Sequence, residues 1–517
     1  MPDRDEIVVR AFLERNAAER RGVAVAFEDG TEWTHADALA QGYRAANVLR
    51  AAGVQRGDHV VVFLPNGADF LRAWWGTACL GAVLVPINLA WKGGLLTHAY
   101  GLTQPAAVVT GGPLAAAFRD AVPDAPFIDA ATLADGPAEA PALDTPIEVW
   151  DRHHIQFTSG TTGPSKGAIA SYRQFALTGS WAADGLGLDE RDTILIDLPL
   201  FHAAALSLGA AALAKGTRLA VRAAPDLRNY WAVAKETGAT YSFIVSAMVT
   251  FLLNQPESAA DRDHSLRAMM VSPLPPNPKE FQRRFGIDVI TTAYGSSEAA
   301  APIVMVPGVP FVEGGCGQGV APYEMKLVDE HDYEVPVGQP GELVVRSAEP
   351  WCLTEGYIGD PAATASLWRN GWLHTGDQLR VDEEGNYFFI DRLKDALRRR
   401  GENVSSYEVE REVGAYPGVA EAACVAAAVE GQADDEVKVW IVPAPEAEID
   451  FPKLAEFLVD RLPHFMVPRF YELVDALPKT PAMRVKKFEL RSRGNGAATW
   501  DLEANGLRVT RDGLVRR

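Results

Sequence analysis

The chain has 517 residues, 48% of them hydrophobic and 23% charged, a globular composition that excludes a disordered chain, a fibrous repeat and a coiled coil. A single core rarely serves a chain this long, so we expect two or more domains. The formal net charge is −19, from 49 Lys and Arg against 68 Asp and Glu, which disfavours general binding to nucleic acid or to an anionic membrane surface. An anionic ligand would therefore need a local binding site of its own.

Short apolar runs rich in β-branched residues recur along most of the chain. They predict strands at 59–65, 82–87, 106–110, 192–200, 216–221, 241–246, 287–295, 324–329 and 341–346. Helix-compatible stretches at 229–238 and 278–286 separate several of these runs. Continuous apolar strands that alternate with helices predict an α/β architecture with parallel sheet.

The last part of the chain has a different pattern. After Asn386 a strand leads through a charged loop into an amphipathic helix, and further strands and a helix follow up to about residue 477. This order predicts a compact α+β domain whose boundary lies near Asp391. We expect the Gly- and Ala-rich tail from Arg493 to wrap over the surface.

Export and membrane insertion are not indicated by the sequence. The N-terminus lacks the apolar core of a signal peptide. The apolar stretch 73–91 is interrupted by Pro86, Asn88 and two glycines, so it is typical of a helix followed by a buried strand. The four widely spaced cysteines predict neither a disulfide framework nor a zinc site. We expect a cytoplasmic protein with no membrane partner.

The strongest local signal is the segment Phe157–Gly167, FTSGTTGPSKG, which combines hydroxyls, glycines and one lysine directly after an apolar strand. Glycines expose backbone N–H groups, hydroxyls donate hydrogen bonds and lysine adds a positive charge, so the loop suits a polyphosphate. It is not a Walker A loop, because Ser165 precedes the lysine and Gly167 follows it. A flexible surface hairpin is the alternative, which the full string disfavours.

With its other motifs, the chain resembles the ANL superfamily of adenylate-forming enzymes, which includes acyl-CoA ligases, peptide-synthetase adenylation domains and luciferases. FTSGTTGPSKG is similar to the family's phosphate loop, and AYGSSE, GWLHTGD and DRLKDALRRRGENVSSYEVE follow in the family's order. The resemblance implies the ANL fold: a large N-terminal domain with mixed and parallel sheets (1–391), a hinge (392–394), a small mobile α+β C-terminal domain (395–492) and a tail (493–517).

The resemblance implies a role for each matching residue. It places the adenylate moiety of ATP or of an acyl-AMP against residues from the four motifs together with Ser272, namely Thr158, Ser159, Gly160, Thr161, Thr162, Lys166, Ser272, Ala293, Tyr294, Gly295, Ser296, Ser297, Asp377 and Arg392. Within that set Asp377 would accept the ribose hydroxyls and Tyr294 would flank the adenine. Glu298 would bind Mg²⁺, since a hard cation prefers carboxylate oxygen.

The acyl and thiol steps are implied in the same way. His202, Ala203, Ser246, Gly295 and Gly317 would line the acyl pocket. The family turns its C-terminal domain about the hinge, at Lys394 here, between adenylation and attack by a thiol, usually that of CoA. Gly401 would admit the slim pantetheine arm. Arg398, Arg399 and Arg400 could meet CoA phosphates, although a solvated charge run is an equal alternative.

One motif departs from the family. The final motif usually reads Pro-Lys-Thr-x-x-Gly-Lys, and its last lysine bridges the carboxylate and the α-phosphate during adenylation. Here Met483 stands where the glycine belongs and Arg484 where the catalytic lysine belongs. Arginine is a wide planar fork, whereas lysine is a compact ammonium group on a thin stem. Lys486 or Lys487 could compensate only by shifting along the loop.

We therefore predict an acyl-CoA ligase-like enzyme that turns an acyl-adenylate into acyl-CoA but is impaired in adenylation, a departure that resembles the non-adenylating acyl-CoA ligases of platensimycin and platencin biosynthesis. A separate adenylating ligase would then supply the acyl-AMP. The alternatives are a complete ATP-dependent acyl-CoA synthetase, a loader of a carrier-bound thiol and a non-catalytic acyl-AMP-binding regulator. The small side chains after His202 agree with a bulky or cyclic acid, although they also suit a packed helix. A homodimer is implied by the family alone.

Overall fold

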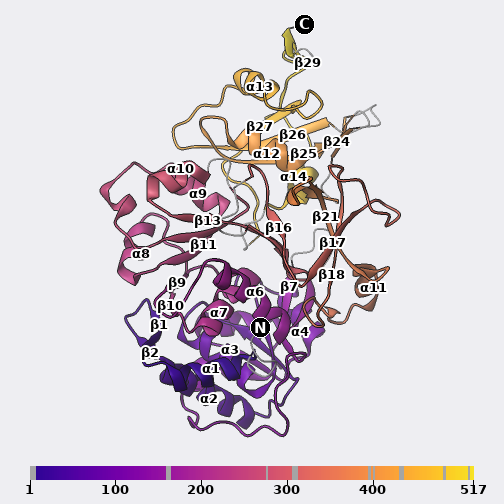
Figure 1. The fold of residues 1–517 in the computed structure, drawn as a ribbon. Helices are drawn as coiled ribbons and strands as arrows, with labels where there is room; N and C mark the ends of the chain where they lie inside the picture. The colour runs from indigo at the N-terminus through magenta and orange to yellow at the C-terminus, as the bar shows by residue number, and fades with distance from the viewer. Residues whose placement is uncertain are drawn as a thin grey trace.

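The computed structural model describes residues 7–158, 165–274, 278–305, 312–393, 397–399, 402–429, 436–480, 485–510 and 513–516. Two sheets with mainly parallel strands lie in the N-terminal part (Figure 1). The first has the order β19 (Gly356–Tyr357), β8 (Lys166–Ser171), β7 (Arg152–Thr158), β4 (Val83–Pro86), β3 (His59–Phe63), β5 (Ala107–Thr110) and β6 (Phe127–Asp129). The second has the order β13 (Val289–Thr291), β12 (Ala268–Ser272), β11 (Tyr241–Val245), β9 (Thr193–Ile196), β10 (Arg218–Val221), β1 (Val23–Phe27) and β2 (Glu32–Thr34).

Only edge strands break the parallel pattern of these two sheets. The strands β8 and β19 run antiparallel at one edge of the first sheet, and β2 runs antiparallel at the edge of the second. Helices that follow the strands cover the sheets: α1 (Val9–Glu19), α2 (His35–Ala51), α3 (Ala68–Leu80), α4 (Gly94–Thr103), α5 (Gly112–Ala121), α6 (Tyr172–Gly185), α7 (Ala203–Lys215), α8 (Tyr230–Thr237), α9 (Ser246–Leu253) and α10 (Pro278–Phe285). The predicted α/β architecture with parallel sheet is confirmed.

A third, antiparallel sheet lies beside them and carries several of the predicted site residues. Its order is β14 (Ala293–Ser296), β15 (Ala300–Val304), β16 (Gly317–Gly319), β22 (Asn386–Arg392), β21 (Trp372–Val381), β18 (Gly341–Ser347) and β17 (Tyr323–Val328), with β20 (Trp368–Arg369) paired to β21. The helix α11 (Pro361–Leu367) packs near this sheet (Figure 1).

The C-terminal domain has a core of its own. Its sheet is β25 (Val419–Ala427), β26 (Glu436–Pro443), β27 (Phe470–Leu473) and β28 (Trp500–Asp501), packed against α12 (Ser406–Gly414), α13 (Phe451–Val459) and α14 (Lys487–Arg493). Two hairpins flank it, β23 (Leu397–Arg399) with β24 (Glu402–Val404), and β29 (Leu507–Thr510) with β30 (Gly513–Arg516).

The tail is built into this domain rather than only wrapped over it. The strand β28 pairs antiparallel with β27, and the Trp500 ring packs against Phe451 and Tyr471. Arg469 forms an ion pair with Asp501 at 3.0 Å. The ring contacts of Trp500 and this ion pair anchor the tail. The composition of the tail alone is typical of a loop. The domain boundaries themselves stay predictions.

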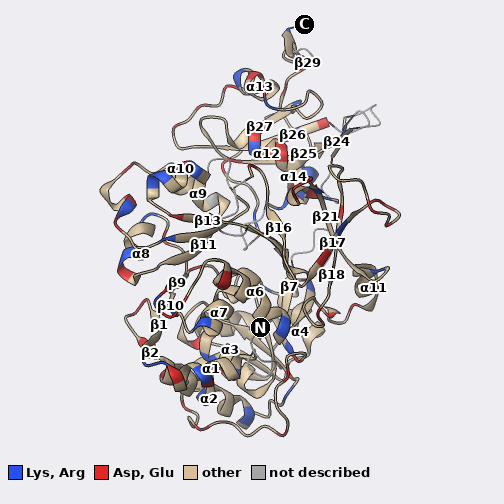
Figure 2. Cartoon of the chain, in the orientation of Figure 1, with Lys and Arg blue, Asp and Glu red and all other residues tan. Residues whose placement is uncertain are grey.

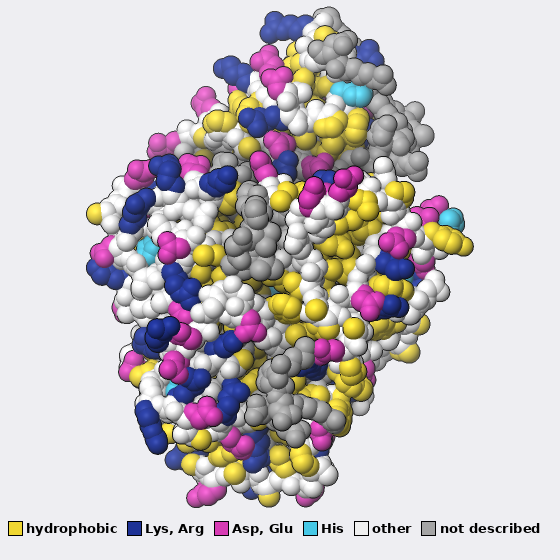
Figure 3. Space-filling view, in the orientation of Figure 1, with side chains coloured by type: hydrophobic (Ala, Val, Ile, Leu, Met, Phe, Trp, Pro, Cys, Tyr) yellow, Lys and Arg dark blue, Asp and Glu magenta, His cyan; other side chains and the backbone are white. Residues whose placement is uncertain are grey.

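Charge is spread over the molecule rather than concentrated. Basic and acidic residues alternate along the helices and loops (Figure 2), and the face drawn in Figure 3 mixes charged side chains of both signs around hydrophobic ones near its middle. No helix in the part of the chain that the structure describes combines the length and the apolar character needed to cross a bilayer.

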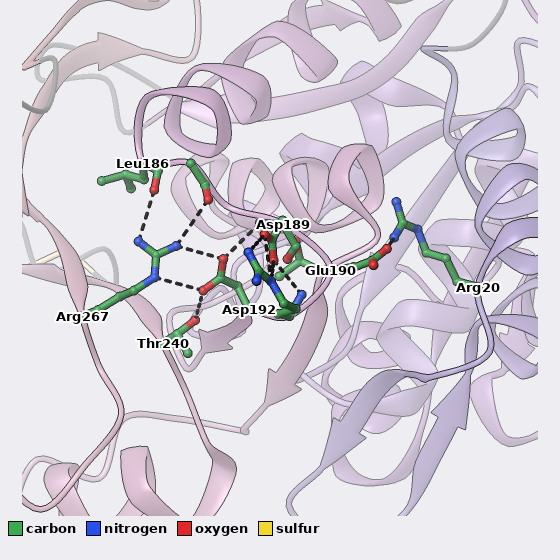
Figure 4. A network of polar contacts seen from close by, with 10 residues as sticks. Arg20, Leu186, Asp189, Glu190, Asp192, Thr240 and Arg267 are labelled. Atoms are coloured by element: carbon green, nitrogen blue, oxygen red, sulfur yellow. Dashed lines mark hydrogen bonds and ion pairs between the residues drawn. The ribbon is translucent and has the colours of Figure 1, made fainter.

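One polar network joins the first helix to the second sheet (Figure 4). The Asp192 carboxylate accepts hydrogen bonds from Thr240 Oγ1 at 2.7 Å and from Arg267 Nη2 at 2.9 Å. Arg20, just after α1, pairs with Glu190 in the same loop. A polar cavity lies beside these residues. Because their charges already pair with one another, we assign no ligand to it.

Two adjacent histidines, His153 and His154, are buried on the strand β7 of the first sheet. His153 Nε2 accepts a hydrogen bond from Trp74 Nε1 at 3.0 Å, and its Nδ1 lies 2.8 Å from His154 Nδ1. The Trp74 ring fits against α7 because Gly209 has no side chain, and a Cβ there would lie 2.5 Å from the ring. Burial lowers the pKa of His153 well below its ordinary value and that of His154 to about 4.

These histidines predict a loss of stability in acid. In the unfolded chain each would take up a proton below about pH 6.5, whereas in the folded chain both remain neutral down to lower pH. The unfolded state therefore binds more protons between about pH 6.5 and 4, and the free energy of unfolding should fall there by about 1.4 kcal/mol per pH unit for each proton.

Urea unfolding at several pH values measures this slope. The variant His154→Gln should flatten it, while His331→Gln, at a highly exposed position, should leave it unchanged. Equal slopes in all three proteins would show that other groups control stability in acid.

Candidate functional site

The predicted phosphate loop joins two paired strands. The strands β7 and β8 run antiparallel with Thr158 opposite Lys166, and Thr158 Oγ1 donates to the Lys166 carbonyl at 3.3 Å. The Lys166 ammonium lies 5.0 Å from the centre of the Tyr357 ring. The intervening predictions, Ser159, Gly160, Thr161 and Thr162, lie outside the described residues. The structure thus fixes both ends of the loop.

Three predicted nucleotide-binding residues meet on the third sheet. Asp377 on β21 is paired with Arg392 on β22, and Arg392 Nε lies 3.4 Å from Asp377 Oδ1. The Tyr294 hydroxyl donates to Asp377 Oδ2 at 2.7 Å. Burial, followed by the Asp377 charge, raises the pKa of Tyr294 well above its ordinary range, so the phenol stays a donor. A carboxylate held from both sides in this way has a fixed orientation.

The second motif forms a tight hairpin between β14 and β15. Gly295 packs so closely on β15 that a Cβ there would lie 2.2 Å from the Ala300 carbonyl oxygen. The Ser296 hydroxyl accepts from the Ala299 N–H at 3.0 Å, and Ser272 Oγ donates to the Ala293 carbonyl at 3.2 Å. The hairpin's own packing therefore demands glycine at position 295, whatever the ligand.

Glu298, at the end of this motif, is held by residues that the sequence analysis did not select. Gln174 Nε2 donates to the Ser297 carbonyl at 3.0 Å, and the Thr354 N–H donates to the Glu298 carbonyl at 2.9 Å. The Tyr357 hydroxyl donates to Glu298 Oε1 at 2.8 Å. Tyr357 lies on the two-residue strand β19, which the sequence analysis did not predict, so only the tertiary contact reveals it.

Apart from Gly295, the predicted acyl-binding residues lie at the starts of α7 and α9 and on the strand β16. His202 caps α7, its Nδ1 accepting from the Ala204 N–H at 3.3 Å, so the neutral ring carries its proton on Nε2. Ala203 begins α7 and Ser246 begins α9. Gly317 has φ +119, and a Cβ there would lie 2.3 Å from the Val304 carbonyl carbon.

The position of His202 is tied to the strand that enters the phosphate loop. Gln156 on β7 donates from Nε2 to the Phe201 carbonyl at 2.6 Å, and the Gln156 side chain is buried. This bond joins the acyl side of the predicted site to its phosphate side.

In the charged run before Gly401, Arg399 is neither solvated nor placed to meet CoA phosphates. Arg399 is buried, pairs with Glu436 at 2.5 Å and donates from Nη1 to the Val467 carbonyl at 2.8 Å. It therefore braces the C-terminal domain and is not presented to CoA, because a buried carboxylate needs its own cation. The described part of the chain does not include Lys394, Arg400, Gly401 or the side chain of Arg398. In Figure 1 the hairpin β23–β24 lies at the outer edge of the C-terminal domain.

The described ends of the altered final motif are paired with each other. Lys479 and Val485 form a β-bridge, and the Lys486 N–H donates to the Pro478 carbonyl at 2.8 Å. Lys486 Nζ pairs with Glu489 at 2.9 Å. Lys487 Nζ pairs with Glu410 at 2.9 Å and donates to Ser406 Oγ. Met483 and Arg484 lie outside the described residues. Both neighbouring lysines are thus paired within the C-terminal domain.

Comparison with known proteins identifies the family of the chain. The profile of the family described as AMP-binding enzyme matches residues 13–358, and that described as AMP-binding enzyme C-terminal domain matches 408–483. A feruloyl-CoA synthase from Amycolatopsis is 32% identical over 479 residues, covering 90% of this chain and 94% of that protein. A crotonobetaine/carnitine–CoA ligase from Citrobacter koseri is 28% identical, covering 87% and 91%.

Solved structures show the same fold. ATP-bound MatB from Rhodopseudomonas palustris superimposes with a TM-score of 0.84 at 25% identity, covering 94% of this chain and 98% of that one. The anthranilate CoA ligase AuaEII, in complex with anthranoyl-AMP, gives 0.85 at 23% identity, covering 94% and 97%. The motifs, the two matched parts and this shared fold agree, and the chain belongs to the AMP-binding enzymes of the ANL superfamily, as an acyl-CoA ligase.

Proposed function

We propose that this acyl-CoA ligase catalyses the second half of the family reaction, the transfer of an acyl group from an acyl-adenylate to CoA, and that its adenylation step is impaired. Arg484 stands where the family's catalytic lysine belongs. A planar guanidinium differs in shape and hydrogen-bonding geometry from the compact ammonium group that the family places between a carboxylate and the α-phosphate. The narrower resemblance to the non-adenylating ligases is not carried by the relatives named above and stays a prediction.

The observation that carries this proposal is the pairing between the two described ends of the final motif. For Lys486 or Lys487 to replace the lysine, the turn would have to slip by two or three residues. That slip would break the Lys479–Val485 bridge and the hydrogen bond to Pro478. It would also strip Glu410, which has a largely buried side chain, of its cation, at a cost of several kcal/mol. Each lysine would therefore have to leave its present partner in order to compensate.

The residues needed for the second half-reaction can be assigned in chemical terms. Asp377 and Arg392 would hold the ribose, and Tyr294 would orient Asp377 and border the adenine. The CoA sulfur then forms a bond to the acyl carbon while the bond from that carbon to the AMP phosphate oxygen breaks, so AMP leaves and the thiol proton passes to solvent. Fixed donors around the leaving phosphate favour this step because they need no reorganisation. Lys394 and Gly401 would serve the turning of the domain and the entry of the thiol.

A complete ATP-dependent ligase is the second candidate, favoured by one observation. Lys166 and Glu298 are both held by Tyr357, and only the outer phosphates of ATP and their Mg²⁺ would need that pair. Among the described residues no cluster of three or more His, Cys, Asp or Glu could hold a metal. One carboxylate with substrate phosphates is a normal site for Mg²⁺, which when bound would neutralise phosphate charge.

The partners follow from the half-reaction. A separate adenylating ligase would supply the acyl-AMP, and CoA would be the acceptor. We further propose a bulky or cyclic acid, because Ala203 and Ala204 present little bulk beside His202. We also propose a homodimer, and only the resemblance to the family supports it.

Separate assays of the two half-reactions test the proposal. With ATP, Mg²⁺ and a panel of carboxylic acids, the pure protein should release pyrophosphate at close to the background rate. With synthetic acyl-AMPs of graded size plus CoA it should form thioesters, fastest with bulky or cyclic acyl groups. Robust thioester formation from free acid and ATP would instead establish the complete ligase, and no turnover of any acyl-AMP would favour a non-catalytic binder.

A further inference from the structure

A short segment that no predicted motif includes lies across the phosphate side of the site. Residues 354–358 pair with the start of β8, with Tyr357 opposite Ala168. The Ile358 N–H donates to the Gly167 carbonyl at 2.9 Å, and Thr354 Oγ1 donates to the Ile169 carbonyl at 2.8 Å. The Thr354 N–H also donates to the Glu298 carbonyl. The segment therefore connects the strand that carries Lys166 to the hairpin that carries Glu298.

Tyr357 contacts both charged groups at once. Its hydroxyl donates to Glu298 Oε1 at 2.8 Å, and its ring lies 5.0 Å from the Lys166 ammonium. Burial, followed by the Glu298 charge, raises the pKa of Tyr357 far above its ordinary value, so the hydroxyl remains a donor at any pH at which the protein works. An ammonium over an aromatic face is held by the ring quadrupole.

We propose that Tyr357 is a positioning residue that sets the Glu298 carboxylate and the Lys166 ammonium on opposite sides of one binding point for Mg²⁺ and the outer phosphates of ATP. With Oε1 bound to the tyrosine hydroxyl, Oε2 would be the oxygen that holds the cation, and the ring would hold the lysine beside it. The inference rests on the roles proposed for Glu298 and Lys166, and not on whether bound ATP reacts.

Equilibrium binding of ATP, without any carboxylic acid, tests each contact separately. Isothermal titration with ATP in EDTA and in Mg²⁺ gives the Mg²⁺-dependent gain in affinity. Tyr357→Phe keeps the ring and loses the hydroxyl, so it should reduce that gain about ten- to a hundredfold, the effect of losing one hydrogen bond to a charged group, while binding in EDTA stays as before. Tyr357→Leu loses both contacts and should also weaken binding in EDTA, by about two- to fivefold.

Two controls separate positioning from a merely structural effect. Tyr43 donates to Glu14 Oε1 at 2.5 Å within the N-terminal helices, so Tyr43→Phe removes the same kind of bond at another place and should not change ATP binding. AMP lacks the outer phosphates, and its affinity should be equal in Tyr357→Phe and the unsubstituted protein. An unchanged Mg²⁺-dependent gain in Tyr357→Phe, or a parallel loss of AMP binding, would overturn the inference. Either result leaves the half-reaction assays unaffected, because binding is measured without turnover.

Discussion

Replacing Arg484 by Lys together with Met483 by Gly should raise the rate of ATP-dependent adenylation by a factor of hundreds to a thousand. A preorganised donor that stabilises charge in the transition state contributes roughly 3–4 kcal/mol, and the double change restores both the slim ammonium and the glycine that lets the turn adopt a positive φ. Thioester formation from synthetic acyl-AMP should change little, because the altered position serves only the first step.

Pyrophosphate release and exchange of labelled pyrophosphate into ATP measure the gain. The matched control is Lys486→Ala, two residues away in the same turn, whose ammonium is already paired with Glu489. That variant should alter neither half-reaction. If the double variant gains nothing over the unsubstituted protein, the arginine is not what limits adenylation, and if Lys486→Ala abolishes a substantial ATP-dependent activity, the turn does use its neighbour.

Replacing Lys487 by Met should lower the free energy of unfolding by about 3 kcal/mol, the cost of leaving a buried carboxylate without its cation. Lys487 and Glu410 are 15% and 21% exposed, and the Glu410 carboxylate also accepts from the Cys424 N–H at 2.7 Å. The pair lies near Asp391, whose carboxylate accepts from the Ser406 N–H at 2.7 Å at the junction of β22 and α12. The substitution should therefore also loosen this junction.

The pH dependence of that variant has a definite sign. Burial raises the pKa of Glu410, and the Lys487 charge opposes the rise. Without the lysine the folded state would take up a proton at Glu410 at a pH at which the unfolded state does not. The folded state then binds more protons, so the stability deficit of Lys487→Met should shrink as pH falls from neutral toward about 5.

Denaturant unfolding of a double-mutant cycle tests this account. Glu410→Gln combined with Lys487→Met should recover much of the loss, because neither charge then remains. Lys453→Met, at a position whose side chain is 72% exposed and whose partner Asp450 is also solvated, should cost less than about 1 kcal/mol. A double variant as unstable as Lys487→Met alone would show that packing, and not charge, carries the effect.

Much of the fold could be predicted from the sequence because strands, helix caps and glycine turns depend on local pattern. Runs such as 59–65 and 241–246 formed the strands expected of them, and the helix-compatible stretches at 229–238 and 278–286 formed helices. The motif order also identified the family, since each motif keeps its residues within a few positions of one another. Asp377, Arg392 and Tyr294 were each selected, and the structure brings them together.

What the sequence by itself determined is therefore many of the strands and helices, the family and the departure at Arg484. Only the tertiary structure decided which side chains meet across long separations: Tyr357 with Glu298, Lys487 with Glu410, and Arg399 with Glu436. The physical reason is that a side chain's partner depends on sheet pairing and burial, which no local pattern encodes. From the sequence, a run of charged residues is expected to be solvated, but packing buries Arg399. Likewise Lys487 has no partner in its own motif, but the fold pairs it with Glu410.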